Sequence, residues 1–322
     1  MTTYKEIFGK YVKNYSSDPT ADIEGQIWYN STTGVFKTNV NLGGAWAAGG
    51  NLGTSRSYLG GCGLQTAGLA FGGMTSYPTN TNVTEEYDGS TWTAGGNMGT
   101  TRRSFPGAGV QTAGLAFGGY TTTNQSATEE YDGSAWTGGG NLGTARRNLA
   151  GAGLQTAGLA FGGTTTGNSN ATEEYDGSAW TAGGNLGTAR YNIGTAGTQT
   201  AGLGFGGSGG ITNATEEYDG SSWTAGGNLN TARGNLSGCG TQTTALGFGG
   251  FITANPGTNA TEEYDGSTWT VGGNLTTARF ALSGGGTQTA GLAFGGATGA
   301  SSSNATEEYT DPSFLTKTIT TS

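Results

Sequence analysis

The residues with the greatest potential for chemistry are twelve glutamates, which occur as six adjacent pairs inside the sequence Thr-Glu-Glu-Tyr. Glycoside hydrolysis needs two carboxylates that flank one bond, roughly 5–10 Å apart. Adjacent residues of a strand face opposite ways, so the two members of a pair do not converge on one substrate. We therefore expect these glutamates to form ion pairs with arginine or to be solvated. The pairs are Glu85-Glu86, Glu129-Glu130, Glu173-Glu174, Glu216-Glu217, Glu262-Glu263 and Glu307-Glu308.

The sequence lacks residues that other catalytic and metal-binding sites commonly use. The chain contains no histidine, which removes the commonest general base and the commonest metal ligand. The recurrent Gly-Gly-Asn-Leu-Gly-Thr sequence lacks the lysine and the following helix of a phosphate-binding loop. We expect no catalytic residues, no metal and no cofactor, and we predict that the protein is not an enzyme.

One arginine also recurs in each repeat, and we expect it to link consecutive repeats. These arginines are Arg56, Arg102, Arg146, Arg190, Arg233 and Arg279. Two cysteines, Cys62 and Cys239, share one repeat position, where the other repeats carry alanine or glycine. This pattern indicates a small packing site that tolerates a thiol. A disulfide is not expected, because repeats one and five are not neighbours in a six-membered ring.

All these residues are positioned by a phrase of about 44 residues that recurs six times, which indicates a repeat architecture. The first tryptophan has no Glu-Glu-Tyr just before it, and the last triplet, Glu307–Tyr309, has no tryptophan after it. This offset predicts a closed ring in which the strand of Trp46 pairs beside Glu307–Tyr309 and completes the last repeat. The six tryptophans are Trp46, Trp92, Trp136, Trp180, Trp223 and Trp269.

The repeat predicts four short strands. Glycine and β-branched residues dominate, and no apolar stripe with a period of 3.6 residues appears, so helix is disfavoured. Asp-Gly between the last two strands, as in Asp88-Gly89, is a strong hairpin signal. Four antiparallel strands repeated radially build a β-propeller blade.

The order of the recurring residue types within each repeat resembles the kelch repeat. Repeat three carries Arg146, Gly162-Gly163, Tyr175-Asp176 and Trp180 in that order. The resemblance covers about 46–309 and implies an all-β, six-bladed kelch-like β-propeller with four antiparallel strands per blade. Copper oxidases of the kelch class use histidine ligands, so they are excluded as models.

Length varies only in the segment between the diglycine and Thr-Glu-Glu. Exposed aromatic side chains among polar residues suit contact with a sugar or a protein surface, and loop drift without selected binding is the alternative. The candidate binding residues are Met74, Tyr77, Tyr120, Ile211 and Phe251. Asn-x-Thr occurs before several third strands, and we interpret this asparagine as a turn former rather than a glycosylation site. These asparagines are Asn82, Asn170, Asn213, Asn259 and Asn304.

Residues 1–45 are a different kind of sequence, which we interpret as an arm that docks to a partner. Apolar residues at helical spacing predict a short amphipathic helix up to Tyr15, with fraying as the alternative. A β-hairpin follows over 26–37, and the tail 310–322 contains a segment, 314–320, that could pair beside it. The candidate docking residues are Tyr4, Ile7, Phe8, Tyr11, Trp28 and Tyr29.

The charge disfavours two classes of partner. The net charge is −9, and 46–309 contains 17 acidic residues and 8 arginines but no lysine. Affinity for a phosphate backbone comes from lysine and arginine, so we expect no nucleic-acid binding. No segment approaches the ~20 apolar residues of a membrane span, so no membrane insertion is expected. The oligomeric state stays open, and a homo-oligomer is compatible with the sequence.

The segment Glu24–Lys37, followed by repeats rich in glycine, serine and threonine, resembles a recurrent N-terminal segment of virion proteins from marine tailed phages. This resemblance implies a tail or capsid appendage of the phage particle, held to other virion proteins by residues 1–45. The variable loops would then contact a glycan or protein on the host surface. The alternative is a soluble glycan-binding propeller lectin with arginine, glutamate and tryptophan exposed between blades.

Overall fold

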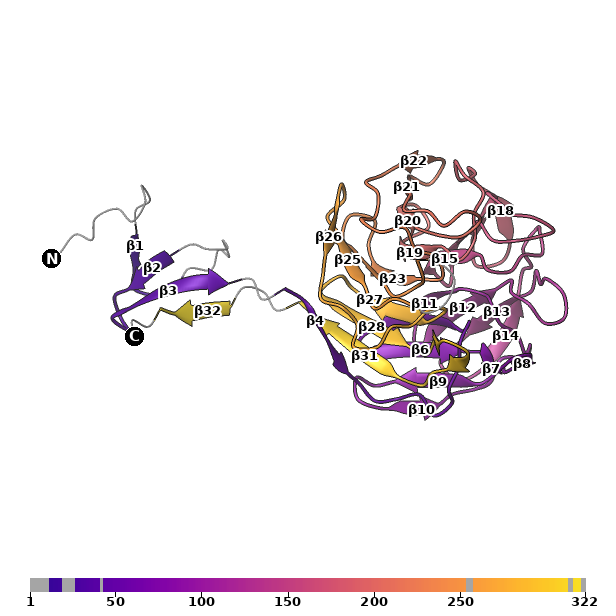
Figure 1. Ribbon diagram of the computed structural model, residues 1–322. Coiled ribbons are helices and arrows are strands. Elements are labelled where there is room, and N and C mark those ends of the chain that lie inside the picture. The colour runs from indigo at the N-terminus through magenta and orange to yellow at the C-terminus, as the bar shows by residue number, and fades with distance from the viewer. Residues whose placement is uncertain (1–11, 19–26, 41–42, 253–256, 312–314, 320–322) are drawn as a thin grey trace. The chain divides into compact units, whose positions relative to one another are not determined.

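The computed structural model describes residues 12–18, 27–40, 43–252, 257–311 and 315–319. The chain divides into two compact units (Figure 1): a small unit of Met1–Gly44 with Asp311–Ser322, and a large unit of Ala45–Thr310. Every regular element among the described residues is a β-strand, and that part of the chain has no helix long and apolar enough to cross a membrane.

The large unit consists of six four-stranded antiparallel sheets, numbered here 1 to 6 along the chain. Sheet 1 contains β5 (Gly60–Leu64), β6 (Ala67–Phe71), β9 (Thr84–Tyr87) and β10 (Trp92–Ala94). Sheet 2 contains β11 (Gly107–Val110), β12 (Ala113–Phe117), β13 (Thr128–Tyr131) and β14 (Trp136–Gly139). Sheet 3 contains β15 (Ala150–Leu154), β16 (Ala157–Phe161), β17 (Thr172–Tyr175) and β18 (Trp180–Ala182). Sheet 4 contains β19 (Gly194–Gly197), β20 (Gly202–Phe205), β21 (Thr215–Tyr218) and β22 (Trp223–Ala225). Sheet 5 contains β23 (Ser237–Gly240), β24 (Ala245–Phe248), β25 (Thr261–Tyr264) and β26 (Trp269–Val271). Sheet 6 contains β27 (Ser283–Gly286), β28 (Ala290–Phe294), β31 (Thr306–Thr310) and β4 (Ala45–Ala48).

Sheet 6 combines both ends of the large unit. Strand β4 pairs antiparallel with β31, and Trp46 lies opposite Tyr309, as the repeat offset predicts. The first strands of consecutive sheets lie beside one another, and β27 of sheet 6 also lies beside β5 of sheet 1. The large unit is therefore a propeller-like all-β arrangement of repeated four-stranded sheets.

Local sequence explains the strands and their close packing. The predicted Asp-Gly hairpin is present in sheet 1, where Asp88 Oδ1 accepts hydrogen bonds from the N–H groups of Ser90 and Thr91. The hydrogen bond from the Thr91 N–H contributes most to lowering the pKa of Asp88 to about 2, and the bonds from Ser90 add to it. In β5, a Cβ at Gly61 would lie 2.4 Å from the ring of Phe294 in sheet 6. The glycine-rich first strands thus let aromatic side chains of the preceding sheet pack against the backbone.

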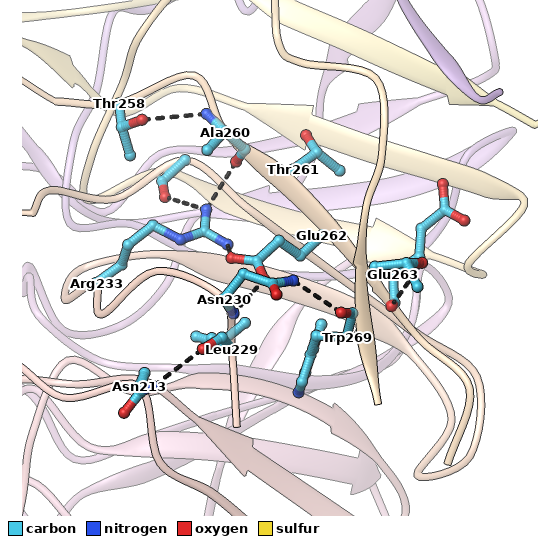
Figure 2. A network of polar contacts seen from close by, with 12 residues as sticks. Asn213, Leu229, Asn230, Arg233, Thr258, Ala260, Thr261, Glu262, Glu263 and Trp269 are labelled. Atoms are coloured by element: carbon cyan, nitrogen blue, oxygen red, sulfur yellow. Dashed lines mark hydrogen bonds and ion pairs between the residues drawn. The ribbon is translucent and has the colours of Figure 1, made fainter. Parts of the chain in front are cut away.

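Each repeat arginine joins two consecutive sheets, and Figure 2 shows the half of these contacts that is made by the guanidinium of Arg233. Its backbone carbonyl accepts from Gly207 N–H, at the end of β20 in sheet 4. Its guanidinium belongs to sheet 5, where it donates to the Ala260 carbonyl at 2.7 Å and to Glu262 Oε1 at 2.9 Å. The same ion pair occurs in all six sheets. The pairs are Arg56–Glu85, Arg102–Glu129, Arg146–Glu173, Arg190–Glu216, Arg233–Glu262 and Arg279–Glu307.

The second glutamate of each pair makes a different bond, and in Figure 2 Glu263 points away from Arg233. Tyr131 of sheet 2 donates its hydroxyl to Glu86 of sheet 1 at 2.5 Å. Tyr87 of sheet 1 donates in the same way to Glu308 of sheet 6 at 2.6 Å. Every repeat tyrosine thus donates to the preceding sheet, and sheet 1 donates to sheet 6. The pairs are Tyr87–Glu308, Tyr131–Glu86, Tyr175–Glu130, Tyr218–Glu174, Tyr264–Glu217 and Tyr309–Glu263.

Tryptophan and glutamine side chains also donate hydrogen bonds to the preceding sheet. The indole N–H of each repeat tryptophan donates to a threonine of the preceding sheet, as Trp136 does to Thr84 at 2.9 Å. Gln111 donates its amide to the carbonyls of Gly68 and Tyr87 in sheet 1. Neighbouring sheets therefore share hydroxyl, indole and amide contacts at equivalent positions.

The small unit is one sheet in the order β1-β2-β3-β32. The predicted hairpin is present as β2 (Ile27–Asn30) and β3 (Val35–Val40), and the C-terminal segment β32 (Leu315–Thr318) pairs with β3 as anticipated. The helix prediction is wrong for its last turn, because Lys13–Tyr15 forms β1, parallel to β2. Pairing with β2 satisfies this backbone and overrides the helical pattern. The remaining arm positions, Tyr4, Ile7, Phe8 and Tyr11, lie outside the described residues.

The arginine contacts predict a large difference between two adjacent arginines. Arg146→Ala should lower the free energy of unfolding by about 3–5 kcal/mol, because it leaves Glu173 buried without its partner. Arg147→Ala is the matched control: its side chain is partly exposed and has no ion pair among the described residues, so the loss should be about 1 kcal/mol or less. Chemical denaturation measures both, and equal losses would contradict this assignment.

The tyrosine–glutamate bonds predict alkaline sensitivity. Burial and the bond to glutamate raise the pKa of five repeat tyrosines, which are Tyr87, Tyr131, Tyr175, Tyr218 and Tyr264, to about 12. Between pH 10 and 12 the unfolded tyrosines lose protons that the folded ones keep, so the free energy of unfolding should fall as pH rises. Denaturation midpoints across this range measure the slope, which should be shallower for Tyr131→Phe. A flat profile would contradict the prediction.

Candidate functional site

The variable loops begin at a fixed structural position. The first residue of each loop forms an isolated antiparallel bridge with the residue that follows the repeat arginine. We call these twelve residues the rim. Their side chains differ from repeat to repeat although the backbone bridge is the same. The rim pairs are Ser57–Met74, Arg103–Tyr120, Arg147–Thr164, Tyr191–Ser208, Gly234–Phe251 and Phe280–Ala297.

The next residue in each repeat has an unusual backbone conformation, with φ between +51° and +59°. Each N–H of this inner row donates to the carbonyl of its counterpart in the preceding repeat, and Tyr58 donates to Ala281. Asparagine tolerates the left-handed region better than most residues, and it occupies three of the six positions. The inner row is Tyr58, Ser104, Asn148, Asn192, Asn235 and Ala281.

A cavity of about 430 Å³ lies where the rim and the inner row of the first repeats meet. It brings together three of the five predicted loop residues, Met74, Tyr77 and Tyr120. The other two do not line it: Ile211 is exposed elsewhere, and Phe251 packs edge-on against Phe280 with ring centroids 6.0 Å apart. The rest of the lining comes from Tyr58, Arg103, Ser104, Arg147, Asn148 and Asn192.

Two arginines and two tyrosines alternate along this cavity. The guanidinium carbon of Arg103 lies 5.7 Å from the Tyr77 ring centroid and 5.0 Å from that of Tyr120. The guanidinium carbon of Arg147 lies 4.7 Å from the Tyr120 centroid. These are cation–π distances, and the stacking holds both guanidinium groups in place. We call these four side chains the Tyr77–Arg147 ladder.

The ladder carries positive charge that no carboxylate of the described residues pairs with. All six repeat arginines have a glutamate partner, whereas Arg103 and Arg147 have no carboxylate within salt-bridge distance among the described residues. Arg103 donates to a neutral acceptor, Asn80 Oδ1, at 2.7 Å. Burial raises the pKa of the nearby Tyr58, and a hydrogen bond from Asn235 and the charge of Arg103 oppose that shift. This arrangement can bind an anion.

Sequence reasoning missed Arg103, Arg147 and the inner row. The signal was available, because the position after the repeat arginine varies as much as the loops do. It reads Ser57, Arg103, Arg147, Tyr191, Gly234 and Phe280 along the chain. What could not be read from the sequence is that this position pairs with the first loop residue.

A second cavity, of about 220 Å³, is lined by the first strands of all six sheets. Half of its lining residues are glycine or alanine, and the lining includes Cys62 and Cys239. Both cysteines are free and buried, and burial raises the pKa of each thiol to about 12. Neither thiol is activated as a nucleophile.

The remaining predicted residues have structural contacts. Asn170 donates its amide to the Leu186 carbonyl at 3.1 Å, and the other Asn-x-Thr asparagines make the equivalent bond, so each of these side chains joins two separate segments. In the small unit, Trp28 is fully buried and donates to Asp18, while Tyr29 packs against Phe36. Trp28 is therefore a core residue of that unit. The described residues hold no group of three or more potential metal ligands.

Comparison with known proteins identifies no family for this chain. No protein-family model matches the chain, and a search of the curated proteins finds no match.

The thiol environment predicts low reactivity. In the native protein at pH 8, Cys62 and Cys239 should react with a disulfide reagent such as DTNB far more slowly than in denaturant, where both should react. The absorbance of the thiolate that DTNB releases measures the rate of the reaction. Rapid stoichiometric labelling of the native protein would show that these thiols are more accessible than the structure indicates.

Proposed function

We propose that the six sheets are the blades of a closed, six-bladed, kelch-like β-propeller. Three observations support this. Strand β4 completes sheet 6, β27 lies beside β5, and the tyrosine, tryptophan and glutamine contacts of sheet 1 are made to sheet 6. The order of arginine, diglycine, Tyr-Asp and tryptophan in each repeat supports the kelch assignment.

We propose further that this propeller is a non-enzymatic binding scaffold. The main observation behind this proposal is that the repeated polar residues are bonded within the fold, whereas residues able to contact a ligand lie elsewhere. The repeated carboxylates are engaged structurally: one glutamate of each pair with arginine, the other with tyrosine, and the aspartate within its own turn. The unpaired arginines, Arg103 and Arg147, lie instead at the rim, near the exposed ring of Tyr77 in the first variable loop. Binding through the rim fits this division better than catalysis by a repeated residue.

The setting we propose is a phage particle, on which the protein is a structural or appendage component held to other virion proteins by its N-terminal arm. Support comes from the resemblance of Glu24–Lys37 to virion proteins and from the division of the chain into a small unit and a large one. The rim would face a glycan or protein of the host surface.

The second candidate is a soluble glycan-binding propeller lectin, and the Tyr77–Arg147 ladder favours it. The version that uses arginine and glutamate exposed between blades does not fit, because the repeat arginines are at most 1% exposed and their glutamate partners at most 8%. A lectin built on this chain would have to bind through the rim.

Mass spectrometry of particles purified from the phage whose genome encodes this chain tests the setting. We expect the protein at constant stoichiometry to the major capsid protein through a density gradient and a high-salt wash. A host cytoplasmic protein serves as the control for adsorption and should be removed by the wash. Loss of the chain together with that control would contradict the virion assignment.

A further inference from the structure

We propose that the rim cavity at the Tyr77–Arg147 ladder binds an anionic saccharide, that is, a sugar chain that carries carboxylate or sulfate groups. This inference rests on the proposed role of the rim as the binding face, and it does not depend on attachment to a particle.

The charge of the ladder is the first argument. Arg103 and Arg147 both lie about 5 Å from the Tyr120 centroid, so their charges are at most about 10 Å apart, a distance within which salt screens incompletely. Within 46–309 acids outnumber arginines by 17 to 8, yet no carboxylate pairs with these two among the described residues. An anion bound to both guanidinium groups would relieve their repulsion, and guanidinium groups bind carboxylate and sulfate through paired N–H donors.

The aromatic residues indicate a flat, partly apolar ligand. Tyr77 is 81% exposed, and one neighbour of its ring is the guanidinium of Arg103. Such an exposed ring is available to the apolar face of a pyranose, while the tyrosine hydroxyl stays in water. Tyr120 lies between the two arginines and holds them for a bound anionic group.

The rest of the lining suits hydroxyl groups. Ser104, Asn148 and Asn192 contribute neutral donors and acceptors, and Met74 is the one aliphatic side chain of the lining. The cavity volume of about 430 Å³ falls within the range of small-ligand sites. Cationic, aromatic and amide groups together match the charge, the ring face and the hydroxyls of an acidic sugar.

Two other anionic partners fit less well. An acidic peptide that extends a sheet needs unpaired backbone groups, but the Arg103 and Tyr120 backbones already bond to each other at 3.1 and 2.8 Å. A nucleic acid needs many lysine and arginine contacts along its phosphate backbone, whereas residues 46–309 contain no lysine and the cavity lining offers two arginines. The acidic saccharide therefore remains the best match.

Calorimetric titration of the full chain tests the proposal. The probes are oligogalacturonate, a sialylated oligosaccharide and a sulfated galactan oligosaccharide, which separate carboxylate from sulfate as the anionic group. The neutral probe is methyl-esterified oligogalacturonate, and oligoglutamate represents an acidic peptide. We expect at least one acidic saccharide to bind, its neutral counterpart to bind at least tenfold more weakly, and affinity to fall with added salt.

Matched variants locate the site. Arg103→Ala and Arg147→Ala should each weaken binding about tenfold or more, because each removes a charged donor. Phe280→Ala, at the equivalent rim position of sheet 6 and outside the cavity, should change affinity less than twofold. Thermal denaturation verifies that the variants are folded.

Three outcomes would overturn the proposal: no binding of any acidic saccharide at millimolar concentration, equal binding of the neutral ester, or equal loss in Phe280→Ala. Tighter binding of oligoglutamate with the same arginine dependence would reassign the site to a peptide. Saccharide binding by a protein that is absent from particles would sustain this inference and reject the virion setting.

Discussion

Six buried arginines are the constraint on which the rest of the large unit depends. Each has its backbone carbonyl bonded to one sheet and its guanidinium fixed inside the next, so two sheets cannot separate without breaking the bond to that carbonyl and opening the site of a buried charge to water. Burial lowers the pKa of Arg146, and Glu173 offsets part of that shift. A buried charge is tolerated only when paired and hydrogen-bonded, which Glu173 and the carbonyls of Gly162 and Ala171 provide.

This constraint frees the rim to vary. The rim bridges are made by backbone atoms, so Ser57 and Met74 hold the same geometry as Arg103 and Tyr120. Side chains there can change without disturbing the arginine that precedes them by one residue. Because the scaffold is repeated and the rim varies, charged and aromatic side chains can cluster in a few repeats without changing the fold, as in the Tyr77–Arg147 ladder.

The four strands of each sheet, the Asp-Gly hairpin and the pairing of Trp46 with Tyr309 were predictable because constant spacing ties every residue to one structural role. The ladder was not, because Arg103 and Arg147 are about 44 residues apart in sequence and become neighbours only through the stacking of sheets. Short hairpins lie in two of the variable loops, β7 (Met74–Ser76) with β8 (Thr79–Asn80) and β29 (Ala297–Thr298) with β30 (Ser301–Ser302), and the loop sequences share no pattern that would reveal them. At Lys13–Tyr15, a helical apolar pattern lost to pairing with β2.

The central claim is that the six sheets close into one cooperative ring. Hydrogen–deuterium exchange at the inner row tests it most directly, because the amide of Tyr58 donates to Ala281 across the proposed closure. The account predicts that this amide exchanges as slowly as those of Ser104, Asn148 and Asn192, through global unfolding alone. Exchange at Tyr58 that is orders of magnitude faster, as at the frayed end of an open array, would contradict closure.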